Sequence, residues 1–225
     1  MWLALDTATD QASLALGLPG TVLAEESVLG ARRQAAELLP MLDRCLARAG
    51  ASLAALEGVV LADGPGSFTG LRVGASLAKA LVHHRGLALW TAPSLLGLAA
   101  ASGEDGALVL AVSDALRGEL FAGAWRVSPA QVDTVLSPGV FAPEELRNRL
   151  PEPERIVGPA AARLGAAPTW PRAAALLGLV GRAGALARVA DPAAWEPSYG
   201  RPAEAQARWE RAHGRPLPDP VRPER

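Results

Sequence analysis

The sequence predicts an α/β protein of two lobes, and three observations support that prediction. The first 102 residues read as strands and helices in the order βββαβαβα. A polar, glycine-bearing break at residues 102–106 is followed by a strand, a turn and a strand that repeat the opening of the chain. The length of 225 residues is enough for two lobes with a core each. We therefore expect a first lobe over residues 1–102, a smaller second lobe over 103–200 and a tail over 201–225.

The elements of the first lobe follow from hydrophobic patterning and turn residues. Three antiparallel strands open the chain, with polar or Pro-Gly turns between them, at residues 2–6, 12–17 and 21–28. A helix over 31–49 has apolar residues at helical spacing and ends at Gly50. A buried strand, a helix, a strand and a helix then follow at 58–62, 71–84, 87–91 and 93–101.

The second lobe repeats this order in a weaker form. Strands are predicted at 107–113, 120–127, 132–135 and 156–157, with a helix at 143–150 between the last two. A long helix rich in Ala, Leu and Gly is predicted from residue 172 to about 189. Beyond residue 200 the chain is rich in proline and arginine, and we expect a loosely held tail with one short helix over 203–212.

Composition excludes several classes of protein. With 22 basic and 23 acidic residues the net charge is −1, so binding of nucleic acid through net positive charge is excluded. Cys45 is the one cysteine, which rules out an intrachain disulfide and a cysteine-rich zinc site, and no metal site is predicted. The start of the chain has no basic region before an apolar stretch, and no apolar stretch is long enough for a membrane. We expect a cytoplasmic protein.

A glycine-rich segment between a buried strand and a helix is the strongest local signal. This segment, DGPGSFTGLR over residues 63–72, is called the glycine loop below. Its backbone N–H groups and the helix start could meet an anion, but it lacks the P-loop lysine and the GxGxxG spacing. The alternative is that its glycines permit a tight turn and close packing while Ser67 or Thr69 caps the helix. Spacing alone favours the alternative.

The turn between the first two strands is a second, weaker signal. Asp6 at the strand end could hold a hydrated metal, and the hydroxyls of Thr7 and Thr9 could touch a phosphate. Asp and Thr in a turn more often only form the turn itself.

Five segments spread along the chain form a pattern when they are taken together. The segments are LALDTATDQASLAL (3–16), AELLPMLDRCLARAG (36–50), GVVLADGPGSFTGLRVG (58–74), DALRGELF (114–121) and EPSYGRPAEA (196–205). With them the chain resembles the TsaB (YeaZ) family of the bacterial tRNA threonylcarbamoyladenosine pathway. The resemblance covers most of the chain, and GPGSFTGLR is its most specific part.

This resemblance implies the two-lobed actin-like ATPase fold (ASKHA, RNase H-like), in which each lobe has a mixed sheet with βββαβαβα order. Such enzymes hold phosphate at the first hairpin of each lobe, and the family is degenerate there. Asp6, Thr7 and Thr9 would be the remnant of that hairpin. No cofactor is firmly predicted, and ATP or ADP is expected to bind weakly or at an interface. The family motif occupies Gly64, Pro65, Gly66, Ser67, Phe68, Thr69, Gly70 and Arg72.

The resemblance also implies that the chain supports an enzyme and does not catalyse a reaction itself. Family members partner the catalytic subunit TsaD, which transfers threonylcarbamoyl from its adenylate to adenosine 37 of ANN-reading tRNAs, together with the ATPase TsaE. We expect a non-enzymatic partner subunit that meets tRNA only within the complex and forms a homodimer when alone.

Two helices are predicted to form the interface to a partner, because they have more apolar or small residues than one core-facing stripe needs. The alternative is that both pack inside the lobe. The interface residues would be Leu38, Leu39, Met41, Leu42, Cys45, Leu46, Gly74, Ala75 and Ala78.

Two other functions compete with a partner subunit. An active actin-like ATPase or phosphotransferase needs a second phosphate hairpin, whereas the turn at residues 113–119 lacks the Gly-Thr type of loop expected there. A dinucleotide-binding domain fails on glycine spacing and on the antiparallel opening.

Overall fold

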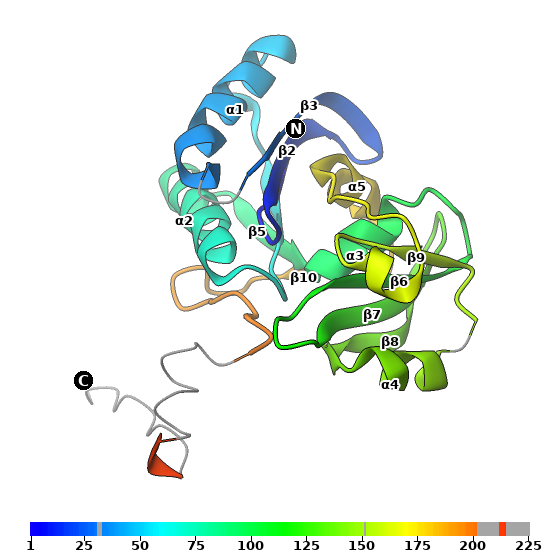
Figure 1. The fold of residues 1–225 in the computed structure, drawn as a ribbon. Coiled ribbons are helices and arrows are strands. Elements are labelled where there is room, and N and C mark those ends of the chain that lie inside the picture. The colour runs from blue at the N-terminus through cyan, green and yellow to red at the C-terminus, as the bar shows by residue number, and fades with distance from the viewer. Residues whose placement is uncertain (31–32, 151, 202–211, 215–225) are drawn as a thin grey trace.

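The computed structural model describes residues 1–30, 33–150, 152–201 and 212–214, and it contains two mixed sheets. The first sheet has six strands in the order β10-β5-β4-β1-β2-β3, and the second has four in the order β8-β7-β6-β9 (Figure 1). In each sheet an antiparallel meander is joined to a parallel strand, β1 to β4 and β6 to β9. The two-lobed α/β prediction is confirmed.

The first lobe has the predicted order βββαβαβα. Its parallel strands place Leu3 beside Val59 and Val60 beside Trp90, so the buried strands of the sequence lie at the sheet centre. The elements are β1 (Trp2–Asp6), β2 (Gln11–Leu18), β3 (Thr21–Leu29), α1 (Gln34–Arg48), a short 3-10 turn η1 (Leu53–Ala55), β4 (Gly58–Ala62), α2 (Phe68–Arg85), β5 (Ala88–Ala92) and α3 (Ser94–Ala100).

The second half keeps the order βββαβ and then departs from the prediction. Its elements are β6 (Leu108–Asp114), β7 (Leu120–Val127), β8 (Val132–Phe141), α4 (Pro143–Arg149), β9 (Arg155–Val157), the 3-10 turn η2 (Ala161–Leu164), α5 (Ala173–Leu179) and β10 (Ala187–Arg188). After η2 the chain returns to the first lobe, where α5 packs on β1 and β2 and β10 pairs with β5.

The long helix predicted over residues 172–189 is therefore wrong in length. Helix α5 ends at Leu179 because Val180 is already extended, with a ψ of 124°, and Gly181 and Gly184 follow with φ values of 87° and 73°. Residues in this left-handed region leave the helical path, and glycine adopts it at little cost. The short helix predicted over 203–212 and most of the predicted tail lie outside the described residues.

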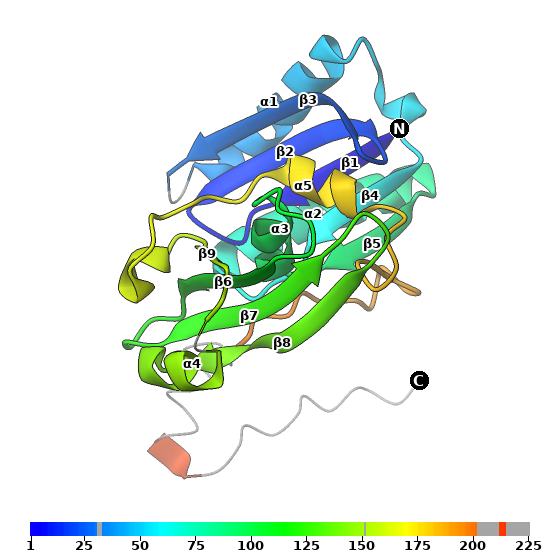
Figure 2. The ribbon, with the colours of Figure 1, turned by 90° about the vertical axis from the view of Figure 1, so that its right-hand side faces the viewer.

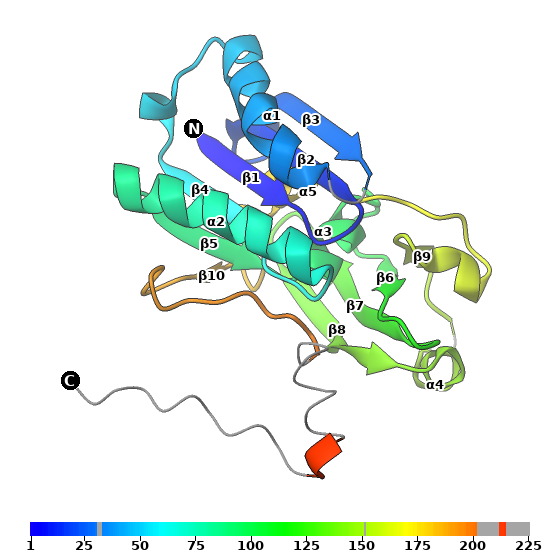
Figure 3. The same cartoon turned by 60° about the vertical axis from the view of Figure 1, so that its left-hand side comes forward.

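The elements stack in five layers. Helices α1 and α2 lie side by side on the outer face of the first sheet (Figure 3), while α3 and α5 lie between the two sheets (Figure 2). One apolar core fills the space under α1 and α2, and a second joins both sheets around α3 and α5. A third lies on the far face of the second sheet, where Leu146 of α4 packs. The central core makes α3 the joint between the lobes.

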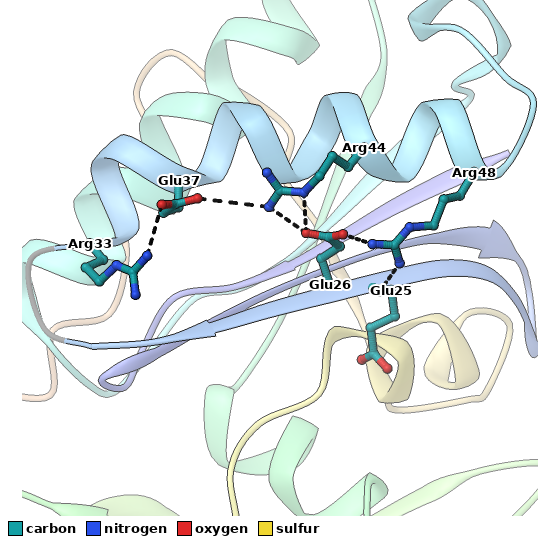
Figure 4. Close-up of polar contacts among 6 residues, drawn as sticks. All are labelled: Glu25, Glu26, Arg33, Glu37, Arg44 and Arg48. Atoms are coloured by element: carbon teal, nitrogen blue, oxygen red, sulfur yellow. Dashed lines mark hydrogen bonds and ion pairs between the residues drawn. The ribbon is translucent and has the colours of Figure 1, made fainter.

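The edge strand β3 is fixed by ion pairs on both faces. Glu26 faces α1, where its carboxylate pairs with Arg44 and Arg48 (Figure 4). The neighbouring Glu25 points to the opposite face, because successive side chains alternate along a strand, and it pairs with Arg172 just before α5. A strand at the sheet edge is thus tied to helices of both adjoining layers.

Candidate functional site

A cleft of about 1060 Å³ lies between the lobes, where the hairpin tips of both sheets meet the glycine loop. It is lined mainly by apolar and aromatic groups, with acidic and basic side chains at the hairpin tips. The lining residues are Ala8, Thr9, Asp10, Gly66, Ser67, Phe68, Ser113, Asp114, Ala115, Leu116, Arg117, Glu119, Phe121, Val140, Pro159, Trp170, Tyr199 and Arg201.

The polar side chains of the first hairpin are used inside the lobe. Asp6 is buried on the α3 side of the sheet, and its Oδ1 accepts a hydrogen bond from the N–H of Ala8 at 3.0 Å. The buried Thr7 donates its hydroxyl to the carbonyl of Gly70 in α2 at 2.8 Å. Thr9 lines the cleft, but its hydroxyl bonds both backbone groups of Gln11. The geometry fits a turn-forming role, and Asp6 and Thr7 do not line the cleft where a metal–nucleotide would lie.

Two buried carboxyl groups at this end of the sheet have raised pKa values. Burial raises the pKa of Asp6 to about 7, against the opposing hydrogen bond from Ala8. Burial likewise raises the pKa of Asp63, at the end of β4, to about 6, and a hydrogen bond with Thr91 opposes it. Desolvation disfavours a charged carboxylate, so both groups hold their protons more tightly than in water.

The glycines of the glycine loop permit close approach of backbones. A Cβ on Gly66 would lie 2.2 Å from the carbonyl oxygen of Ala8, and one on Gly70 would lie 2.0 Å from that of Thr7. A Cβ on Gly64, whose φ is 114°, would lie 1.8 Å from the carbonyl oxygen of Ser198. The packing interpretation of these glycines is thus confirmed, because each lies where a side chain would collide with backbone.

Several backbone groups of the loop are already hydrogen-bonded. The N–H of Gly64 donates to Ser94 Oγ at 2.9 Å, and that of Ser67 donates to the Ala8 carbonyl at 2.7 Å. Ser67 is the N-cap of α2, and its hydroxyl accepts from the N–H of Gly70, as the capping alternative predicted. These N–H groups are therefore engaged within the fold.

Residues 196–201, called the strap below, cover the glycine loop and reach the second lobe. The Ser198 N–H donates to the Asp63 carbonyl at 2.8 Å, and the ring of Tyr199 lies 4.6 Å from that of Phe68. At its end, Arg201 forms an ion pair with Glu119 of the β6–β7 turn. The sequence alone predicted no role for these residues. The one available signal was that EPSYGR belongs to a segment that carries the family resemblance.

The turn of the second hairpin is held by its own contacts. Leu116 and Arg117 have φ values of 63° and 54°, and Gly118 continues the left-handed turn. Asp114 accepts from the N–H of Leu116 at 2.9 Å, and Arg163 pairs with Asp114 and donates to the Glu119 carbonyl. The turn resembles an ordinary solvated hairpin in its contacts, and it forms one wall of the cleft.

The predicted interface residues are corrected by their burial. Leu39 alone among them is exposed, at 59%, whereas the rest lie in the core between α1, α2 and the first sheet. A Cβ on Gly74 would lie 2.3 Å from the Thr7 hydroxyl, so this small residue serves packing within the lobe. The buried residues are Leu38, Met41, Leu42, Cys45, Leu46, Gly74, Ala75 and Ala78.

Two further observations concern the described residues only. They contain no helix long and apolar enough to cross a membrane. Within those same ranges, no three His, Cys, Asp or Glu side chains gather as a metal site would require.

The fold and the cleft define a protein of the two-lobed actin-like class. A family model described as TsaD, tRNA N6-adenosine threonylcarbamoyltransferase, matches residues 28–185. One similar solved structure is YeaZ from Pseudomonas aeruginosa, with a TM-score of 0.67 and 27% sequence identity, covering 80% of this chain and 90% of that one. A second is described as an uncharacterized protein with similarity to peptidase YeaZ from Pseudomonas aeruginosa. Its TM-score is 0.72 and its sequence identity 27%, covering 89% of this chain and 99% of that one. The chain belongs to this family, and within it to the TsaB (YeaZ) proteins.

Sequence relatives agree with this placement. The chain is 38% identical over 121 residues to the tRNA threonylcarbamoyladenosine biosynthesis protein TsaB of Escherichia coli, covering 53% of this chain and 52% of that protein. It is 29% identical over 134 residues to the protein of the same name in Bacillus subtilis, covering 60% and 58%. The chain thus spans about half the length of the curated relatives it matches.

Proposed function

We propose that this chain is a non-catalytic partner subunit for threonylcarbamoylation of adenosine 37 in tRNA, acting in the cytoplasm with TsaD and TsaE. Membership of the TsaB (YeaZ) proteins is the observation that carries the proposal, since relatives bear the name of that pathway. The first hairpin supports it, because Asp6 and Thr7 are bound within the lobe and do not line the cleft. A subunit that supports another enzyme needs a stable fold and an exposed face more than it needs chemical groups.

The outer face of α1 and α2 is our candidate for contact with TsaD. Leu39 is exposed on α1, with 59% of its surface accessible. Both helices cover the face of the first sheet that points away from the second lobe, so the second lobe does not block a partner from reaching them. The proposal keeps the two helices predicted from sequence but assigns the contact to their outward residues.

The test is size-exclusion chromatography with light scattering, on this chain alone and mixed with TsaD of the same organism, with and without ATP. We expect a one-to-one complex, which Leu39→Asp weakens at least tenfold. Val135→Asp is the matched control, because Val135 is also exposed, at 49%, but lies on β8 of the second lobe. Absence of a complex under every condition contradicts the function, whereas a complex that tolerates Leu39→Asp contradicts only the face.

The cleft supports a second candidate function, that of an active ATPase or phosphotransferase. The size of the cleft and its arginines at positions 117 and 201 are the observations that favour it. Calorimetry with ATP and a phosphate-release assay on the chain alone separate the two. Tight binding with turnover supports the phosphotransferase, while weak binding without turnover supports the partner subunit.

A further inference from the structure

In the part of the chain that the structure describes, the lobes meet at a broad joint and at the edge of the cleft. At the joint, α3 packs on β6 and β7, a continuous apolar core joins both sheets, and Ala183 of the α5–β10 connection hydrogen-bonds the backbone of Ala130 and Val132. At the edge of the cleft, the strap reaches from the first lobe to the β6–β7 turn. In Figure 3 the orange part of the chain runs from the edge of the first sheet toward the second sheet. The apolar packing around α3 can therefore act as a hinge, and the polar contact between the strap and the β6–β7 turn can hold the other end closed, as a clasp would.

The strap is fixed firmly to the first lobe. Its backbone bonds Asp63 through Ser198, and the carbonyl of Ser198 lies so near Gly64 that no side chain fits between them. Lys79 of α2 holds Glu196 at 3.5 Å. The strap therefore moves with the first lobe.

The contact of the strap with the second lobe is small. A Cβ on Gly200, whose φ is 70°, would lie 2.6 Å from Pro65 Cβ and 2.7 Å from the ring of Phe121. Gly200 is itself exposed, but the position of its missing side chain faces one residue of each lobe, and the next residue, Arg201, pairs with Glu119. Two residues of the strap, one glycine and one arginine, make this connection.

Two buried polar atoms without partners lie at or near this contact. Among the described residues, Ser113 Oγ and Arg201 Nε are the buried side-chain atoms that lack a hydrogen bond. Both residues line the cleft, and Ser113 pairs across the strands with Phe121, which Gly200 touches. Buried polar groups are almost always hydrogen-bonded, so separating this contact would let water reach both atoms. The closed state is thereby penalised at the clasp itself.

We propose that Gly200 and Arg201 form a releasable clasp that closes the cleft, and that breaking the Arg201–Glu119 pair lets the lobes part about the α3 joint. The proposal concerns this chain alone, so it does not depend on any partner or on the proposed function. It assigns a role to the strap that the fold comparison does not supply. The clasp controls access to the cleft from the hairpin side.

The experiment measures the separation of the lobes by electron spin resonance between nitroxide labels on Ser76→Cys in α2 and Val135→Cys in β8. Both positions are exposed, whereas Cys45 is buried and stays unlabelled. We expect one narrow distance distribution in the parent and a second, longer population in Arg201→Glu. The double variant Glu119→Arg with Arg201→Glu restores the pair with reversed charges, and the longer population disappears.

Two further variants keep the result decisive. Gly200→Ala forces the strap away from Pro65 and Phe121 without a change of charge, and it also opens the lobes. Arg126→Glu breaks an exposed ion pair with Glu154 inside the second lobe and leaves the distance unchanged. Circular dichroism confirms that each variant is folded. An unchanged distribution in both Arg201→Glu and Gly200→Ala overturns the clasp, and opening that the charge reversal does not restore overturns the ion pair as its fastening.

Discussion

The guanidinium carbon of Arg72 lies 4.3 Å from the centre of the Phe68 ring, one turn apart in α2. Tyr199 of the strap joins them, with its ring on Phe68 and its hydroxyl accepting from Arg72 Nε at 3.3 Å. The same hydroxyl donates to Glu196 at 3.2 Å. The most specific motif of the sequence thus binds a segment more than 120 residues later in the chain, since Arg72 and Tyr199 are 127 positions apart.

Removal of the Tyr199 ring should loosen the strap from the first lobe. Tyr199→Ala loses the aromatic contact with Phe68, and we expect a loss of about 1–2 kcal/mol in the free energy of unfolding, from the aromatic pair and its burial. Tyr199→Phe keeps the ring and loses only exposed hydroxyl contacts, so less than about 1 kcal/mol is expected. Urea unfolding measures both. Equal losses would show that the hydroxyl, and not the ring, fixes the strap.

The glycine loop should resist even one added methyl group. Gly66→Ala places a Cβ 2.2 Å from the Ala8 carbonyl oxygen, and overpacking of this kind costs about 1–3 kcal/mol. Gly178→Ala in α5 is the matched control, because its Cβ meets nothing within 4 Å and alanine is the better helix former. Thermal and urea unfolding should show a marked loss for the first and none for the second. A stable Gly66→Ala protein would refute the packing role.

Stability should fall as pH rises from about 4 to about 7. The pKa of Asp6 is about 7 in the folded chain against an ordinary value of 3.8, so the folded state binds its proton more tightly. The contribution of this group is fully present below the unfolded pKa and is lost as pH rises through the folded pKa. Asp63, with a pKa of about 6, acts in the same direction over a narrower range.

Asp6→Asn isolates this effect from the other titrating groups. The amide oxygen can still accept from the Ala8 N–H, and it carries no charge to desolvate. We expect the variant to gain stability relative to the parent between about pH 4 and 7, with little difference at the acid end. Urea unfolding of both proteins across this range measures the difference. A difference that does not change with pH would mean that Asp6 is not protonated on folding.

Local patterning was sufficient to predict the order of the first lobe. Alternation and turn residues placed β1, β4 and β7 at their observed bounds, because these strands are short apolar runs between clear turns. The end of α5 was not predictable in the same way. Its continuous Ala and Leu composition favours a helix, but the backbone turns extended at Val180, and the left-handed Gly181 and Gly184 follow.

The candidate site was predicted only where it is local in sequence. Capping by Ser67 and the close-packing role of the loop glycines follow from the strand–loop–helix order. The strap contacts did not follow, because they join residues 63–72 to 196–201 and depend on the return of the chain to the first sheet at β10. The burial of the α1 residues could not be predicted either. An apolar stripe on a helix does not show how many of its residues face the core, because that depends on how closely α1 packs on the sheet.

Glu26 should stabilise the edge strand in a salt-dependent way. Its carboxylate is largely buried and pairs with both Arg44 and Arg48 of α1 (Figure 4). Glu26→Gln removes the ion-pair partner of Arg48 and leaves Arg44 only the longer contact with Glu37 at 4.0 Å. We expect a loss of about 1–2 kcal/mol at low ionic strength, and a smaller loss in high salt. Glu57→Gln, which removes an exposed partner of the N-terminus, should cost less than about 1 kcal/mol. Urea unfolding at two salt concentrations distinguishes them.

Leu42 and Leu39 separate a core role from a surface role on the same helix. Leu42 is 3% exposed and packs against the first sheet, so Leu42→Ala should cost about 2–5 kcal/mol through lost burial and the cavity left behind. Leu39 is 59% exposed, so Leu39→Ala should change the free energy of unfolding by less than about 0.5 kcal/mol. Urea unfolding of the isolated chain measures both and is repeated on Leu39→Asp, and light scattering with TsaD then tests that variant once its fold is shown to be intact. Because Leu42→Asp would bury a charge, it should abolish the fold together with any association. A folded Leu42→Asp chain that fails to bind would restore Leu42 to the interface.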